Sequence, residues 1–325
     1  MSSRRGSIIG AVVALALVGT ACGKGSSGDN RSPSGAGSFA AEVGSTDLYV
    51  GAPQRFEIGI YQSTSSAGVK LVTFGQVGLS FAYLGADGKQ PATPGAQVTG
   101  TYLGAPTTAT SQGGPTLSDP STARGVYQAE NVIFDQPGFW QVTVTADVAG
   151  AGRQELTTTF PVAAKPTYPA PGEPALKTDN LTLATKDVPA SAIDSRATDT
   201  EPVPDPELHR WTIARALAEH RPILVIFATP TYCQSQFCGP TTDGVAALAG
   251  RYGDRAVFIH VEIWRNYQKS VINQGAADWL YHNGDLTEPW LYLIGSDGII
   301  KDRWGPLFDP AEVANDLAAL PPMKG

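Results

Sequence analysis

The chain has 325 residues, of which 42% are hydrophobic and 16% are charged, so it can bury more than one core and its length predicts two domains. Its formal net charge is −7, and no run of Lys or Arg follows the N-terminus. This charge balance excludes a protein that binds nucleic acid through a basic surface.

Residues 1–22 predict an export signal. Arg4 and Arg5 precede an apolar run that ends at Val18 and is short for a membrane span, and "GTAC" then closes at Cys22. This end resembles the lipobox of bacterial lipoproteins, although Gly19 stands where that family has a branched residue. The resemblance implies that Cys22 is lipidated and anchors the exported protein to the extracytoplasmic face of the membrane. The alternative is an ordinary secretory signal.

Residues 23–45 are rich in Gly and Ser and predict a flexible tether.

Residues 46–164 show the period-two alternation of β-strands. Apolar residues alternate in "RFEIGIY", "VGLSFAYLG", "GFWQVTVTAD" and "ELTTTFPV", and turn signals separate these segments. The pattern predicts an antiparallel, immunoglobulin-like β-sandwich, without the cysteine pair that bridges the sheets of true immunoglobulin domains. Residues 90–124, rich in Thr, Gly, Pro and Ser, predict a long loop or a disrupted strand. The sequence of residues 46–164 contains no metal-binding cluster, paired nucleophile or phosphate-binding loop, which favours a spacer or a partner-binding module.

Residues 165–206 predict a stiff linker between the two domains. Prolines recur there at Pro166, Pro169, Pro171, Pro174, Pro189, Pro202, Pro204 and Pro206. Fixed φ angles and missing N–H donors favour an extended connection over a core element.

Residues 207–322 change to an α/β pattern. The expected order is a helix at 206–220, a buried strand at 222–229, a helix at 239–253, a second buried strand at 256–264, a short helix at 275–283, a hairpin of 289–295 and 298–305, and a final helix at 309–320. Asp309 is expected to cap the last helix, with Pro310 at its first position.

An apolar strand that runs into "CGP", and a later "EPWLYLI" before a hairpin, resemble the thioredoxin fold over about residues 172–322. The stretch "FATPTYCQSQFCGP" is similar to a thioredoxin-like group of exported actinobacterial proteins. The resemblance implies a C-terminal α/β thioredoxin-like domain that exchanges disulfides with exported proteins carrying thiols or disulfides. It implies no nucleotide, flavin or metal cofactor.

Cys233 and Cys238 depart from the family pattern, because four residues separate them where thioredoxins have two. Aligning "CGP" gives Cys238 the attacking position, whereas aligning the distance from the strand gives it to Cys233. Pro240 suits the start of a helix, and the helix dipole there favours Cys238 as the attacking thiolate and Cys233 as its disulfide partner.

Glu288-Pro289 carries the second part of the resemblance. In thioredoxin-like proteins a cis-proline before a central strand packs against the disulfide, and the preceding backbone pairs with the substrate. The resemblance therefore implies that Pro289 is cis and that Glu288 and Pro289 bind substrate. A cis X–Pro bond costs only about 0.5–1 kcal/mol. The alternative is a proline that merely starts a strand.

Two other functions stay open for the cysteines. The pair could form a structural disulfide, worth about 2 kcal/mol, in a non-catalytic surface lipoprotein that binds partners through its β-sandwich. Alternatively, the chain resembles Sco-type copper chaperones in having a cysteine pair and distant histidines, of which His282 lies seven residues before Pro289.

The remaining polar residues have simpler expected places. His209 and His220 are expected on the surface of the first helix, and His260 is expected as a satisfied core histidine. Glu262 is expected to face solvent at a strand end, although a buried carboxylate that relays protons to a thiol is the alternative.

Overall fold

The structure is a computed structural model that describes residues 37–64, 68–105, 108, 113–198, 200–233 and 237–323. Residues 37–325 form one compact unit. The predicted export signal, Cys22 and most of the predicted tether lie outside the described residues. No helix within the described ranges is long and apolar enough to cross a membrane.

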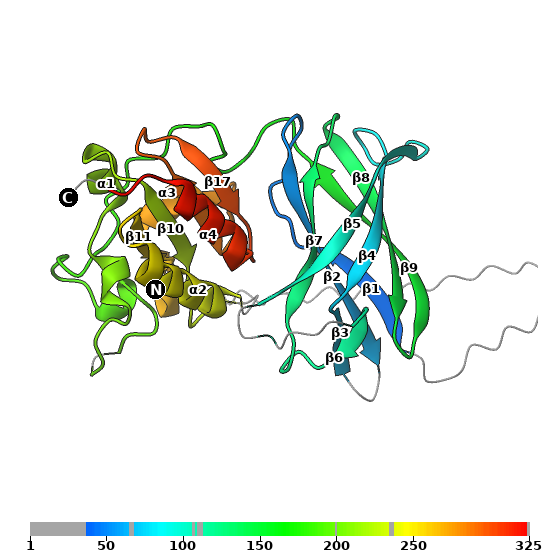
Figure 1. Ribbon diagram of the computed structural model, residues 1–325, viewed down its shortest axis with the longest axis horizontal. Coiled ribbons are helices and arrows are strands. Elements are labelled where there is room, and N and C mark those ends of the chain that lie inside the picture. The colour runs from blue at the N-terminus through cyan, green and yellow to red at the C-terminus, as the bar shows by residue number, and fades with distance from the viewer. Residues whose placement is uncertain are drawn as a thin grey trace, which may run out of the picture. The chain divides into compact units, whose positions relative to one another are not determined.

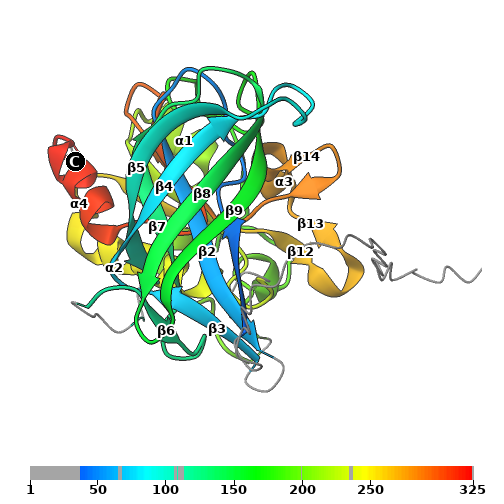
Figure 2. The same cartoon turned by 90° about the vertical axis from the view of Figure 1, so that its right-hand side faces the viewer.

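The N-terminal half forms a β-rich lobe (residues 38–163). Its strands are β1 (Ser38–Val43), β2 (Gln54–Thr64), β3 (Gly68–Thr73), β4 (Gln76–Tyr83), β5 (Thr93–Gly104), β6 (Thr116–Ser118), β7 (Gly125–Val132), β8 (Gly138–Val148) and β9 (Gly152–Val162). They pair antiparallel in the order β6-β3-β2-β7-β5-β4-β8-β9, with β1 on β2. Figure 2 shows β5, β4, β8 and β9 side by side in this curled sheet.

The β-rich lobe confirms the antiparallel prediction and differs from it in detail. Strand β5 pairs with both β4 and β7, so the strands form one continuous curled sheet where an immunoglobulin-like sandwich has two. Strands β5 and β6 lie in the segment 90–124, for which a long loop or a disrupted strand is expected. Most of β5 is exposed, so its sequence lacks apolar alternation. Main-chain pairing with β4 on one edge and β7 on the other stabilises it as a strand. Strand β1 lies within the predicted tether, which therefore ends earlier.

The C-terminal half forms an α/β lobe (residues 206–320; Figure 1). Its helices are η2 (Pro206–His209), α1 (Ile213–Ala218), α2 (Cys238–Tyr252), η3 (Tyr267–Lys269), α3 (Gln274–Leu280) and α4 (Pro310–Ala319). Its strands are β10 (Ile223–Ala228), β11 (Val257–Glu262), β12 (Trp264–Asn266), β13 (Val271–Ile272), β14 (Tyr281–His282), β15 (Asp285–Leu286), β16 (Trp290–Ile294) and β17 (Ile300–Trp304). The predicted strands, the hairpin and the helices expected at 239–253 and 309–320 are present, and Asp309 caps α4 by accepting the N–H of Ala311. The helix expected at 206–220 is instead two short helices, η2 and α1, and the helix expected at 275–283 ends at Leu280.

The main sheet of this lobe has the order β11-β10-β16-β17. Strands β10 and β11 are parallel, whereas β16 and β17 form an antiparallel hairpin on the other side of β10. Every residue of β10 is buried, because alternate side chains enter two cores. Helices α2 and α4 share one core with Leu224 and Ile226, and helices α1 and α3 share the other with Val225 and Phe227. The lobe therefore has three layers.

The segment 165–206 is folded onto the α/β lobe, which corrects the expectation of an extended linker. Ile193 and Asp194, beside a short helix η1 (Ala190–Ala192), are buried. Asn180 Oδ1 accepts the N–H of Ile213 at 2.8 Å, and Trp279 donates to Thr178 Oγ1 at 2.9 Å. The segment thus supplies partners that buried donors of the lobe require.

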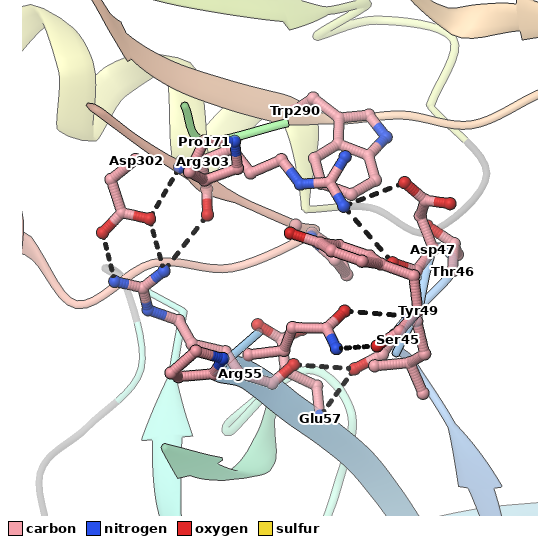
Figure 3. Close-up of a pocket in the computed structure, with 15 residues that line it drawn as sticks. Ser45, Thr46, Asp47, Tyr49, Arg55, Glu57, Pro171, Trp290, Asp302 and Arg303 are labelled. Atoms are coloured by element: carbon pink, nitrogen blue, oxygen red, sulfur yellow. Dashed lines mark hydrogen bonds and ion pairs between the residues drawn. The ribbon is translucent and has the colours of Figure 1, made fainter. Parts of the chain in front are cut away.

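Two arginines join the lobes (Figure 3). Arg55 on β2 lies 2.7 Å from Asp302 on β17 and also contacts Glu312 on α4. In the opposite direction, Arg303 Nη2 on β17 lies 2.8 Å from Asp47 Oδ2. Because each lobe gives a guanidinium to a carboxylate of the other, the contact fixes both position and orientation.

Candidate functional site

The two cysteines form a disulfide between β10 and α2, with their Cα atoms 5.9 Å apart. A backbone hydrogen bond holds the segment that leads from β10 to Cys233, because the Cys233 N–H donates to the Thr229 carbonyl at 3.1 Å. Cys238 is the first residue of α2 and is 0% exposed, whereas Cys233 is partly exposed. A reagent arriving from solvent therefore meets Cys233 first.

The N-terminus of α2 acts on Cys233. Helix α2 begins at Cys238, one residue before the predicted start at Gly239, and the N–H of Cys238 donates to the Sγ of Cys233 at 3.4 Å. This N–H belongs to the first turn of a helix of 15 residues, where unsatisfied donors and the helix dipole favour negative charge. Once the disulfide is reduced, this arrangement favours a thiolate over a neutral thiol at Cys233.

Glu288 and Pro289 lie beside the disulfide. The Glu288-Pro289 peptide bond is cis, as predicted. A carboxylate oxygen of Glu288 and the Sγ atoms of Cys233 and Cys238 all lie within 4.8 Å of one another, and Glu288 Oε2 is buried without a hydrogen-bond partner among the described residues. Burial, followed by the nearby Glu262 carboxylate, raises the pKa of Glu288 to about 8. At neutral pH the side chain is therefore an acid that can give a proton to a departing thiolate.

Glu262, at the end of β11, is buried, which corrects the expectation that it faces solvent. It is only 2% exposed, because its neighbour across the parallel ladder is Ala228 in the fully buried strand β10. It accepts the N–H of Ser195 at 2.8 Å and that of Trp264 at 3.1 Å. Burial raises the pKa of Glu262, and the positive charge of His260 opposes that shift.

Ser195 ties this carboxylate to the cysteine loop. Its Oγ accepts the N–H of Thr231, and its carbonyl accepts the Thr231 hydroxyl at 2.8 Å. Thr231 is two residues before Cys233. Glu262, Ser195 and Thr231 therefore form a continuous hydrogen-bonded support beneath the disulfide.

His209, His260 and Asp194 form a second buried cluster. His209 is 0% exposed, which corrects its predicted surface place, because η2 packs inward beside Leu208. His260 is a core histidine, as expected, with Nε2 3.1 Å from the Ala228 carbonyl. Asp194 Oδ2 lies 3.3 Å from His209 Nε2 and from His260 Nδ1.

The charge of this cluster follows from its hydrogen bonds. A carbonyl only accepts, so His260 Nε2 carries a hydrogen, and a proton at Nδ1 then faces the Asp194 carboxylate. Burial alone lowers the pKa of His260, but the hydrogen bond and charge of Asp194 outweigh it and the pKa is raised. Burial lowers the pKa of His209. Although three ligand atoms converge, Arg196 Nη2 lies 2.7 Å from the same Asp194 Oδ2, so a guanidinium already supplies the cation there.

Sequence reasoning placed Cys233, Cys238 and Pro289 together but missed part of the site. Asp194 and Ser195 come from the segment expected to be a linker, and no periodicity marks them. His282 lies on β14 with its ring 5.0 Å from that of Tyr168, and the third group beside the cysteines is Glu288. His220 is exposed on the surface, as expected.

Neither a protein-family model nor a curated protein sequence matches the chain. The functional assignment therefore depends on the chemistry of the site itself. That chemistry consists of a disulfide at a helix N-terminus, a more exposed sulfur that accepts a helix N–H, and an adjacent buried carboxyl group.

Proposed function

We propose that the protein is a thiol:disulfide oxidoreductase whose α/β lobe has a thioredoxin-like fold. The observation that carries the proposal is the N–H of Cys238 donating to Cys233 Sγ at the start of α2. The three-layer arrangement, the parallel β10-β11 pair and the cis Glu288-Pro289 bond beside the disulfide support it. The predicted export signal and the resemblance to a lipobox ending at Cys22 favour a lipid-anchored protein outside the cytoplasmic membrane, where its partners would be exported proteins with thiols or disulfides.

In the proposed reaction Cys233 attacks and Cys238 resolves. This reverses the roles favoured by the sequence, because Cys238 is 0% exposed and the helix donates its N–H to Cys233. The Cys233 thiolate bonds to one sulfur of a partner disulfide, and the other partner sulfur leaves as a thiolate. Cys238 then attacks Cys233 Sγ, which re-forms the disulfide and releases the second partner thiolate. Two electrons pass from the cysteine pair to the partner, and the reverse sequence oxidises a partner dithiol.

Glu288 moves the proton of Cys238 in this scheme. In the forward direction the ionised fraction of Glu288, which grows as the pH rises towards its pKa of about 8, accepts the proton of the Cys238 thiol as its sulfur attacks. In the reverse direction the neutral Glu288 protonates Cys238 as it leaves. The distance of less than 4.8 Å between the carboxylate oxygen and both sulfurs supports this role.

A pH profile tests Glu288. The rate constant for reduction of the Cys233-Cys238 disulfide by dithiothreitol, divided by the thiolate concentration of the reagent, should fall as pH rises through about 8, the raised pKa of Glu288. The proton donor is present below that pKa and lost above it. In Glu288→Gln the amide cannot supply the proton, so the profile between pH 7 and 9 should be flat and the value at pH 7 about tenfold lower. An unchanged profile in the variant would remove Glu288 from the mechanism.

The reduction potential of the disulfide tests the function as a whole. We expect a value between roughly −120 and −270 mV, the range of known exchange catalysts. It is measured by thiol trapping in glutathione buffers on Cys22→Ser, in which only Cys233 and Cys238 react. A potential below about −300 mV would instead support the alternative, a structural disulfide in a non-catalytic surface lipoprotein.

A further inference from the structure

A mostly apolar groove of about 660 Å³ lies beside the disulfide. The β-rich lobe lines it with residues that include Val43, Ile60, Leu71 and Val126, and the α/β lobe lines it with Phe237, Glu288 and Pro306. This volume is within the range of sites that bury most of a ligand.

The groove adjoins both the disulfide and the contact between the lobes through shared or neighbouring residues. Phe237 directly precedes Cys238 and packs with Val126 of β7 and with Leu307. Glu288 also lies beside the two sulfurs. At the other side, Thr46 and Pro306 line both the groove and the pocket formed around the interlobe arginines (Figure 3).

In the wall formed by the β-rich lobe, strand pairing is interrupted along one edge of β2. Along one edge, β2 pairs with β7 as far as Ile58 and Tyr127, and it pairs with β3 from Tyr61 and Leu71 onward. Gly59 and Ile60 stand between these two ladders, while β1 pairs with the opposite edge of β2. An extended segment can add its main chain at such an interruption, as peptides do at sheet edges.

We infer that this groove binds an extended, apolar, cysteine-bearing segment of the partner polypeptide, so that the β-rich lobe selects the substrate of the exchange reaction. The inference rests on the proposed function. Apolar side chains of the segment would contact Val43, Leu71 and Phe237, and its sulfur would lie next to Cys233. Exported chains that have not finished folding expose such segments.

Gly59→Val tests the groove, because Gly59 lines it and an added Cβ meets only the Glu42 carbonyl, at 3.9 Å. Gly78→Val is the matched control: it is also a strand glycine of the β-rich lobe, its Cβ would meet Thr145 at 3.8 Å, and it does not line the groove. The probes are an apolar peptide and a polar peptide, each carrying one cysteine as a mixed disulfide with glutathione, and oxidised glutathione alone.

The reduced wild-type protein should react with the apolar peptide at least about tenfold faster than with the polar one, since one buried apolar side chain contributes more than 1.4 kcal/mol. Gly59→Val should lose this preference and keep its rate with glutathione, and Gly78→Val should keep both. If Gly59→Val does not fold, Val43→Gln on the same wall serves in its place.

The outcomes separate the groove from the chemistry. Equal rates for the two peptides in the wild type, or a full preference in Gly59→Val, would overturn the inference while leaving exchange intact. No reaction with any probe would instead refute the proposed function. A second copy of the chain as occupant would give a dimer by sedimentation that Gly59→Val dissociates, and this result would also overturn the inference.

Discussion

Cys238→Ser should accumulate a stable mixed disulfide with a partner, whereas Cys233→Ser should form none. Cys233 is the exposed sulfur and the one that accepts a helix N–H, so it makes the first bond. Without Cys238 nothing resolves that bond, and turnover should stop in both variants. Incubation with an oxidised partner peptide followed by mass spectrometry without reductant measures the adduct. In the reduced wild type, iodoacetamide should also modify Cys233 faster than Cys238, because Cys233 is partly exposed and accepts a helix N–H that favours its thiolate, whereas Cys238 is buried.

The two cysteine variants control for each other. Both should be made in the Cys22→Ser background, so that the third cysteine cannot form the adduct. An adduct that accumulates in Cys233→Ser and not in Cys238→Ser would reverse the assigned roles and restore those that the "CGP" register favours. Such a result would require α2 to unwind at its first turn, because Cys238 is buried in the oxidised protein.

The α/β lobe was predictable because its elements carry strong local patterns. Each residue of β10 and β11 is buried, so β10 is a continuous apolar run and β11 is apolar apart from His260 and Glu262. Strand β5 gives no such signal, because its side chains are mostly exposed and its two neighbours hold it through main-chain pairing. The continuous curl of the sheet depends on those same ladders, which leave no mark on the order of apolar residues.

The candidate site divides in the same way. The cysteine pair and Pro289 lie at element ends that the pattern locates. The support beneath the disulfide joins Ser195 to Glu262 across 67 residues, and a contact of that separation has no periodic signature. Prolines alone make residues 165–206 resemble a linker. In the structure, polar atoms of this segment form hydrogen bonds with buried polar groups of the α/β lobe.

Removing the side chain of Arg303 should destabilise the protein by about 3–5 kcal/mol, because a buried carboxylate would lose its partner. The side chains of Arg303 and Asp47 are 7% and 2% exposed and 2.8 Å apart. Arg303 Nη1 also donates to the carbonyls of Tyr168 and Pro169, and its guanidinium lies 4.9 Å from the centre of the Trp290 ring. The free energy of unfolding of Arg303→Leu, from urea titration, measures the loss.

Lys301→Ala is the matched control for Arg303→Leu, because Lys301 is on the same strand and pairs with Asp297 where both side chains are about half exposed, at 44% and 54%. That exposed pair should contribute far less to the free energy of unfolding, because solvent screens its charges. Adding Asp47→Asn to Arg303→Leu should recover part of the stability, since the stranded charge is then gone. Because Arg303 joins the two lobes that line the groove, its loss should also weaken the preference for apolar peptides while leaving the reaction with glutathione unchanged. Equal losses in Arg303→Leu and Lys301→Ala would mean that the arginine contacts do not hold the lobes together, and the wall of the groove would then need another anchor.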